Sequence, residues 1–178
     1  MILPLVLVTL EGANPDSERD LDVATTVWGG ECEVFVDIID RLVVDRDDLL
    51  LLDQDDCSGE GHSVSDEEDE LFSLGRGLGT DVVGYYITGD TGGALRGCAA
   101  HPPGRRGFWV GDSATDFTFA HEMTHVVGDN PHAGDSDNLM FAPTTGITNP
   151  PPDLTEEQCT RIIEDPALLS IPSIVLSL

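Results

Sequence analysis

Residues 117–128 read Phe117-Thr118-Phe119-Ala120-His121-Glu122-Met123-Thr124-His125-Val126-Val127-Gly128. The spacing of the apolar residues predicts a helix with one apolar side, formed by Phe119, Met123, Val126 and Val127. His121 and His125 are four residues apart, so both imidazoles lie on one face of this helix. Glu122 follows about 100° further round. The stretch therefore predicts a helix that presents two metal ligands and a carboxylate to the same place, and the rest of the chain is arranged around it.

The ends of this helix have their own signals. Ser113 and Asp116 form a Ser-x-x-Asp start, and Gly128 is a natural stop because glycine adopts the left-handed cap without strain. The His-Glu-x-x-His spacing is typical of zinc enzymes, in which the glutamate accepts a proton from water at the metal. A catalytic zinc site needs a third protein ligand. His132 is the candidate, because residues 128–131 turn the chain back, and Asp129 and Asp135 are the alternatives.

The motif His121-Glu122-x-x-His125-x-x-Gly128, a third histidine and the downstream Asn138-Leu139-Met140 resemble the metzincin class of zinc metalloproteases. The pattern of that class is HExxHxxGxxH, followed by a turn that contains methionine. His132 comes one residue later than the pattern requires, because Pro131 occupies the expected position.

This resemblance implies one zinc ion held by His121, His125 and His132, with Glu122 as the general base in peptide hydrolysis. Met140 would form an apolar floor under the imidazoles. In metzincins an extended substrate binds along an edge strand, which here implies substrate contacts from Gly93, Ala94 and Leu95. The loop of residues 143–152 would form part of the pocket for the side chain after the cut bond.

The predicted fold is an α+β domain of the α/β/α type. It has a twisted, mostly parallel sheet of four to five strands, an active-site helix and a C-terminal helix. Strands are expected at residues 5–10, 33–39, 49–52, 82–87, 94–100 and 108–110, and further helices at 14–28 and 154–169. Residues 53–56 and 65–70 are expected to be exposed acidic turns, and 171–178 to pack on the body. Residues 1–178 form one catalytic domain, with an upper subdomain at about 1–128 and a lower one at about 129–178.

The charge of the chain is strongly one-sided. Thirty-four acidic residues face eight basic ones, all arginine, for a net charge of -26. Such self-repulsion is tolerated at molar salt, where the screening length falls to about 3 Å. The composition therefore indicates a halophilic source and excludes nucleic acid and anionic membranes as partners. No apolar run has the length of a membrane span, and a peptide or protein substrate of a monomeric enzyme is expected.

The four cysteines, Cys32, Cys57, Cys98 and Cys159, lack CxxC spacing and favour two disulfides over a metal cluster. The preferred pairing is Cys32 with Cys57 and Cys98 with Cys159, and free thiols in a reducing cell are the alternative. Disulfides indicate an extracellular or cell-surface protein whose signal has been removed. The cytoplasm of a halophile is the other location left open.

Together these features predict a zinc-dependent endopeptidase. One alternative is a zinc hydrolase outside the metzincins, with Glu156 or Glu157 as the third ligand. Another is a binding domain of the same fold without catalysis. Gly128 and the Asn-Leu-Met sequence count against the first, and the presence of Glu122 counts against the second.

Overall fold

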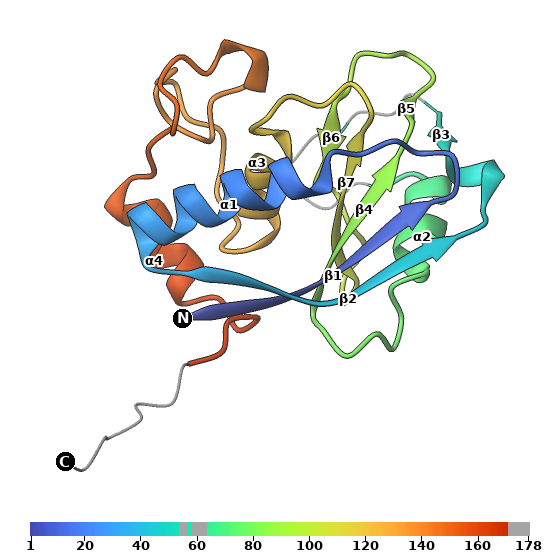
Figure 1. The fold of residues 1–178 in the computed structure, drawn as a ribbon, viewed down its shortest axis with the longest axis horizontal. Coiled ribbons are helices and arrows are strands. Elements are labelled where there is room, and N and C mark those ends of the chain that lie inside the picture. Colours follow the sequence, from blue (N-terminus) through green and yellow to red (C-terminus); the bar gives the residue numbers. More distant parts are fainter. Residues whose placement is uncertain (54–56, 58–63, 171–178) are drawn as a thin grey trace.

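A computed structural model describes residues 1–53, 57 and 64–170, and it contains a five-stranded sheet between helices (Figure 1). Across the sheet the strands are β2 (Phe35–Val44), β1 (Ile2–Leu10), β4 (Val82–Ile87), β7 (Arg106–Gly111) and β6 (Gly97–Cys98). The first four are parallel, and β6 pairs antiparallel with β7 at one edge. The short strands β3 (Leu51–Leu52) and β5 (Gly89–Asp90) pair separately. The prediction of a mostly parallel sheet is confirmed.

Both faces of the sheet are covered, which explains why β1 is apolar along its length. Leu3, Leu5 and Leu7 belong to the hydrophobic cluster under α1 (Ser17–Cys32), α3 (Thr118–Val126) and α4 (Glu156–Ile163). Val6 and Val8 belong to a second cluster, with side chains from α2 (Asp66–Ser73). Alternate residues of one strand therefore fill two cores, and the architecture is α/β/α as predicted.

Two predicted helices have different bounds in the structure. α1 begins at Ser17, with the Asp16 side chain accepting a hydrogen bond from the Arg19 backbone, and it continues past both predicted stop glycines to Cys32. The C-terminal helix α4 is shorter than the predicted 154–169, because it ends at Ile163, three residues before Pro166. Packing on the sheet and the disulfide at Cys32 hold α1 in a helix beyond its glycines.

The acidic segment 65–70 is not an exposed turn but the start of α2. Ser65 and Glu68 form a complete capping box, and the Glu68 side chain is buried, where it accepts a hydrogen bond from Trp109 Nε1 at 3.0 Å. The Ser-x-x-Glu pattern before Leu71-Phe72 was the signal for this helix.

The disulfides exist, but their predicted pairing was wrong. Cys32 at the end of α1 is bonded to Cys159 on α4, and Cys57 is bonded to Cys98 on β6. Proximity along the chain favoured Cys32 with Cys57. The fold instead places the end of α1 beside α4, on the opposite side of the sheet from the cluster that contains Cys98 and Cys57.

The short helices η1 (Asp47–Leu49) and η2 (Thr144–Gly146) complete the elements of the described residues. The predictions for residues 54–56 and for the tail 171–178 lie outside the described part of the chain. Within that part, no helix has the length and apolar character needed to cross a membrane.

Candidate metal centre

The helix α3 is fixed against the sheet by its apolar side and against α1 by a buried hydrogen bond. Phe119, Met123 and Val127 are fully buried, as predicted, and Trp28 Nε1 donates to Thr124 Oγ1 at 2.9 Å. The predicted cap by Ser113 and Asp116 is absent, since the N-cap residue is Phe117 and no side chain caps it. Tertiary packing rather than a cap therefore determines where the helix begins.

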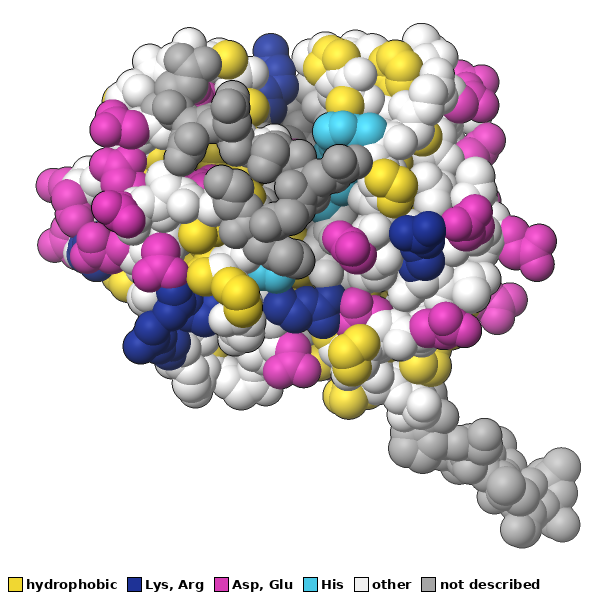
Figure 2. Space-filling view, turned by 180° about the vertical axis from the view of Figure 1, so that it is seen from behind, with side chains coloured by type: hydrophobic (Ala, Val, Ile, Leu, Met, Phe, Trp, Pro, Cys, Tyr) yellow, Lys and Arg dark blue, Asp and Glu magenta, His cyan; other side chains and the backbone are white. Residues whose placement is uncertain are grey.

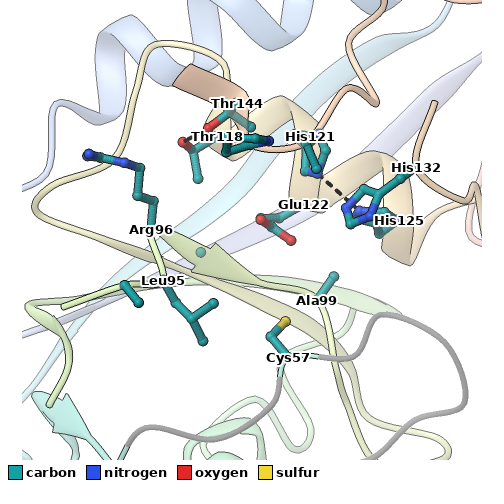
Figure 3. A pocket seen from close by; sticks show the side chains of 14 residues that line it. Cys57, Leu95, Arg96, Ala99, Thr118, His121, Glu122, His125, His132 and Thr144 are labelled. Atoms are coloured by element: carbon teal, nitrogen blue, oxygen red, sulfur yellow. Dashed lines mark hydrogen bonds between the residues drawn. The ribbon is translucent and has the colours of Figure 1, made fainter. Parts of the chain in front are cut away.

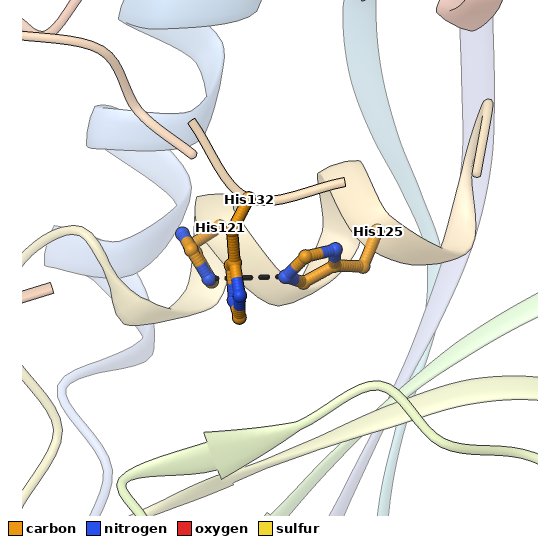
Figure 4. A group of neighbouring side chains, drawn as sticks. All are labelled: His121, His125 and His132. Carbon is orange, nitrogen blue, oxygen red and sulfur yellow. Dashed lines mark hydrogen bonds between the residues drawn. The ribbon is translucent and has the colours of Figure 1, made fainter. Parts of the chain in front are cut away.

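His121 and His125 are oriented by backbone carbonyl groups. His121 Nδ1 lies 2.8 Å from Leu139 O, and His125 Nδ1 lies 2.6 Å from Asn130 O. A carbonyl oxygen only accepts, so each Nδ1 carries the proton and each Nε2 carries a lone pair. The two Nε2 atoms face each other at 3.1 Å (Figure 4). Two neutral rings in this tautomer have no proton to share between these atoms, and a cation between them would satisfy both.

Burial keeps these rings neutral. It lowers the pKa of His121 to about 3 and that of His125 to about 4, and the neighbouring histidines act in the same direction. Neutral imidazole is the form that binds a metal ion. The pair is therefore ready to bind metal at neutral pH without first losing protons.

His132 completes the group, although it comes one residue late in the sequence. Its ring centre lies 5.3 Å from that of His121 and 4.8 Å from that of His125 (Figure 4). The late position is accommodated by two successive left-handed residues, Gly128 at φ 89° and Asp129 at φ 48°, which reverse the chain after α3. Asn130 then supplies the carbonyl group that holds His125.

One atom from each of the three histidines lies within 4.8 Å of the others, and this is the single such group of metal-binding side chains among the described residues. The alternative ligands Asp129, Asp135, Glu156 and Glu157 are not in the group. Glu157 instead pairs with Arg161 at 2.9 Å on the surface of α4.

The residues present fit a zinc ion. Two nitrogens bound to zinc at about 2.0–2.1 Å in a tetrahedral arrangement lie about 3.3 Å apart, close to the observed Nε2 separation. Three imidazoles without a fourth protein ligand also match the open arrangement of catalytic sites rather than the closed one of structural sites.

Glu122 lies beside the histidines and faces the same cavity (Figure 3). Its side chain is buried, and burial raises its pKa from the ordinary 4.5 to about 8. Gly97 of β6 covers it closely, since a Cβ atom at that position would lie 2.8 Å from Glu122 Cγ and 2.8 Å from Thr118 Cγ2. The edge strand therefore needs glycine here, a requirement that the sequence analysis missed.

The cavity in front of the histidines has a volume of about 370 Å³ (Figure 3). Ala94 and Leu95, two of the three predicted substrate contacts, line it, together with Ala142, Pro143 and Thr144 from the loop after the methionine. Gly93 instead lies in a turn, with its N–H donating to Asp90 O at 3.0 Å. The structure thus joins the edge-strand segment and the 143–152 loop around one space.

Met140 follows the residue that holds His121 and is fully buried in the cluster under α3. Asn138 Oδ1 accepts a hydrogen bond from Met140 N at 2.9 Å and another from Gln158 Nε2 at 3.1 Å, and Asn138 Nδ2 donates to Gln158 Oε1 at 2.9 Å. The turn that carries the methionine is therefore anchored to α4. Gln158 was not singled out from the sequence, although Thr155-x-x-Gln158 matches the capping box that it forms.

A partly buried ion pair supports the end of α3. Asp165 accepts from Arg106 Nη1 at 2.7 Å and Nη2 at 2.6 Å, and from the Gly128 N–H at 2.9 Å. Arg106 also donates to Val126 O, one of the last carbonyl groups of the helix. Burial alone would raise the pKa of Asp165, but these hydrogen bonds keep it below its ordinary value. No local pattern in the sequence signals this long-range pair.

The sequence matches no known protein-family profile, and no curated protein is a significant match to it. Solved structures do resemble the fold. Metalloproteinase-II from Bacteroides fragilis superposes with a TM-score of 0.60 at 15% identity, over 92% of this chain. This chain spans only 52% of that protein, about half of its length.

The archaemetzincin AmzA of Methanopyrus kandleri superposes with a TM-score of 0.58 at 16% identity, covering 90% of this chain and 93% of that one. A chain from a chaperone–substrate complex superposes at 0.56 with 13% identity, over 90% of this chain and 33% of its own length. At these identities the likeness shows a shared fold, and two of these three proteins are a metalloproteinase and an archaemetzincin.

Proposed function

We propose that this protein is a zinc-dependent endopeptidase of the metzincin type, in which His121, His125 and His132 hold the ion and Glu122 is the general base. The observation that carries the proposal is the pair of Nε2 lone pairs at 3.1 Å, with the Glu122 carboxyl beside them in one cavity. The fold shared with a metalloproteinase and an archaemetzincin supports it.

When bound, zinc supplies Lewis acidity that polarises a carbonyl oxygen and makes water more acidic. Glu122 accepts the proton of the attacking water and then passes it to the leaving nitrogen. In the metal-free protein burial raises the pKa of Glu122 to about 8, and a bound cation beside it would lower this value toward the range that suits a general base at neutral pH. The backbone of Gly97 packs closely against the Glu122 side chain on the side of β6.

The substrate would lie extended along residues 93–95 and β6. Within the described part of the chain, β6 is the last strand of the sheet and pairs with β7 on one side, so its outer edge is where a further strand would pair. Main-chain hydrogen bonds to an edge strand hold a peptide without demanding a particular sequence. Such pairing would place the peptide across the cavity, with a carbonyl group near the histidines and Glu122.

The proposal is tested by replacing Glu122 with Gln and measuring zinc content and peptide cleavage in parallel. Glu122→Gln should retain one zinc per chain and lose about 10²–10⁴-fold in kcat, because the ligands remain and the proton acceptor is gone. Glu157→Gln is the matched control, since that glutamate is exposed and pairs with Arg161 on α4. A Glu122→Gln protein that cleaves peptides at the wild-type rate would exclude Glu122 as the base.

The surroundings in which the enzyme works are also part of the proposal. Two disulfides and a net charge of -26 support an exported protein in a salt-rich medium. Figure 2 shows acidic side chains spread over the visible face instead of gathered at one point. Their mutual repulsion is therefore distributed over this surface and is the kind that a high salt concentration screens. A monomer divided into subdomains at about residues 1–128 and 129–178 remains a prediction.

A further inference from the structure

One end of the cavity carries a positive charge. Arg96 lines the cavity at the end where Thr118 and Thr144 lie, and His125 and His132 lie at the other (Figure 3). Among the described residues that line the cavity, Glu122 is the one with a carboxyl group. The cavity therefore joins the metal centre to a cationic end, in a protein that is elsewhere strongly acidic.

Arg96 differs from most arginines of this chain in its partners. Among the described residues, no carboxylate forms an ion pair with it, and its guanidinium donates to the carbonyl oxygen of Ser113. Five of the eight arginines pair with a carboxylate: Arg19, Arg46, Arg105, Arg106 and Arg161. One neutral acceptor leaves most of the five N–H groups of a guanidinium available to a ligand.

Two hydroxyl groups lie at the same end. Thr118 Oγ1 and Thr144 Oγ1 are 3.2 Å apart, and each is 3.0 Å from Thr115 Oγ1. Thr118 Oγ1 also accepts from the Thr115 N–H at 3.0 Å, so Thr144 can turn its proton toward a ligand without leaving Thr118 unsatisfied. Arg96 and Thr144 line the same end of the cavity, and a guanidinium together with a rotatable hydroxyl is a donor set suited to a carboxylate.

We propose that Arg96 and Thr144 bind a carboxylate group of the substrate next to the scissile bond, so that the enzyme selects acidic peptides. The inference rests on the proposed peptidase function and names its substrate class. Salt screens the net charge of -26 at long range, so the contacts that a carboxylate makes inside the cavity decide whether it binds, and Arg96 is the cation there. The carboxylate is either an acidic side chain or the free C-terminus of a short peptide.

The test compares peptides that differ only in charge. One set carries Glu or Gln at each position within three residues of the cleaved bond, with an amidated C-terminus, and a second set of neutral peptides ends in a free acid or an amide. Zinc-loaded wild type should prefer the carboxylate peptide by about 10-fold or more in kcat/KM, the size expected for a charge-assisted hydrogen bond. A preference in the first set identifies a side chain, and one in the second set identifies the C-terminus.

The matched variants are Arg96→Gln and Arg41→Gln. Arg96→Gln should lose the preference, so that kcat/KM for the carboxylate peptide falls to the value for the neutral one. Arg41→Gln should keep the preference, since Arg41 is exposed on β2 at the opposite edge of the sheet and bonds a neutral hydroxyl, Ser17 Oγ. Thr144→Val should weaken the preference severalfold, and it serves as the second variant if Arg96→Gln fails to fold.

Equal cleavage of the charged and neutral peptides by wild type would overturn the inference and leave the peptidase function standing. So would an equal loss on both peptides in Arg96→Gln, which would show that Arg96 only holds Ser113 in place. Binding of the same peptides to zinc-loaded Glu122→Gln separates the two proposals. A tighter Kd for the carboxylate peptide there supports the inference even without turnover, and equal Kd values overturn it.

Discussion

His121 Nδ1 lies 2.8 Å from the carbonyl oxygen of Leu139, so α3, which carries two of the proposed metal ligands, is hydrogen-bonded directly to the turn that carries Met140. Asn138 fixes this turn, because its side chain forms hydrogen bonds with the Met140 N–H and with the Gln158 side chain on α4. The orientation of a metal ligand on α3 therefore depends on contacts made as far away as α4. Loss of such supporting hydrogen bonds weakens metal sites even when every ligand is present.

Asn138→Ala should lower zinc affinity by about 10-fold or more, because the Leu139 carbonyl is no longer held against His121. Competition with a chelator of known affinity measures the change. Ser136→Ala is the control, since it removes an exposed hydrogen bond to Thr148 in the same loop. Equal zinc affinity in the two variants would show that the turn does not orient the ligand.

Gly128→Ala should destabilise the fold by about 2–4 kcal/mol, because alanine is strained at a φ of 89° and overpacks the site. Its Cβ atom would lie 2.8 Å from both the Arg161 carbonyl carbon and the Ile162 nitrogen, which are backbone atoms of α4. The control is Gly30→Ala in α1, where a Cβ atom meets nothing within 4 Å and about 0.5–1 kcal/mol of stabilisation is expected. Denaturant unfolding of the two variants checks the contrast, and similar unfolding free energies would contradict it.

Removing each disulfide by a Cys→Ser pair should destabilise the protein unequally. The Cys32–Cys159 bond spans 127 residues and the Cys57–Cys98 bond spans 41. Loop-closure entropy then gives losses of about 5 kcal/mol and about 4 kcal/mol. Peptide mapping under non-reducing conditions tests the pairing itself, and recovery of a Cys32–Cys57 peptide would contradict the structure.

The stability of the metal-free protein should depend on pH through Glu122. Its pKa is raised from 4.5 to about 8 on folding, so the folded state holds a proton that the unfolded state has lost, and stability falls as pH rises between these values. Glu122→Gln removes this loss of about 1.4 kcal/mol per pH unit. The lowered pKa values of His121 and His125 reduce the stability of the folded state below pH 6.5. This effect is the same in wild type and in Glu122→Gln, so it cancels when the two are compared.

The measurement is the unfolding free energy of metal-free Glu122→Gln minus that of wild type, at pH 5 and pH 8. The difference should grow with pH by a few kcal/mol. Glu157→Gln, an exposed carboxyl group on α4, should show no such growth. If the unfolding free energies of Glu122→Gln and wild type changed with pH in the same way, the buried carboxyl group would ionise in the folded protein as easily as in the unfolded one.

The parts of this fold that depend on local pattern were predictable from the sequence. The apolar run of β1 and the His-Glu-x-x-His spacing of α3 each carry their signal within about ten residues. The parts that depend on distant contacts were not. Cys32 meets Cys159, and Arg106 meets Asp165, only because the fold brings separate segments together.

One local signal was present but was not used. Ser65-x-x-Glu68 forms a capping box, but the segment was interpreted as an exposed turn because it is rich in acidic residues. The cationic end of the cavity had no signal of this kind, since Arg96 and Thr144 are 48 residues apart in the sequence and share one cavity only in the fold. His132 lies beside the other two histidines despite its late position, because a turn of Gly128 and Asp129 in left-handed conformations absorbs one extra residue.

The zinc content of purified protein, wild type against His132→Ala, tests the three-histidine centre most directly. His101→Ala is the control, because His101 lies outside the group of three. Wild type and His101→Ala should hold one zinc per chain with peptide cleavage that a chelator abolishes, and His132→Ala should lose most of its zinc and its cleavage. Full zinc occupancy in His132→Ala, or wild type that binds no zinc, would contradict the account.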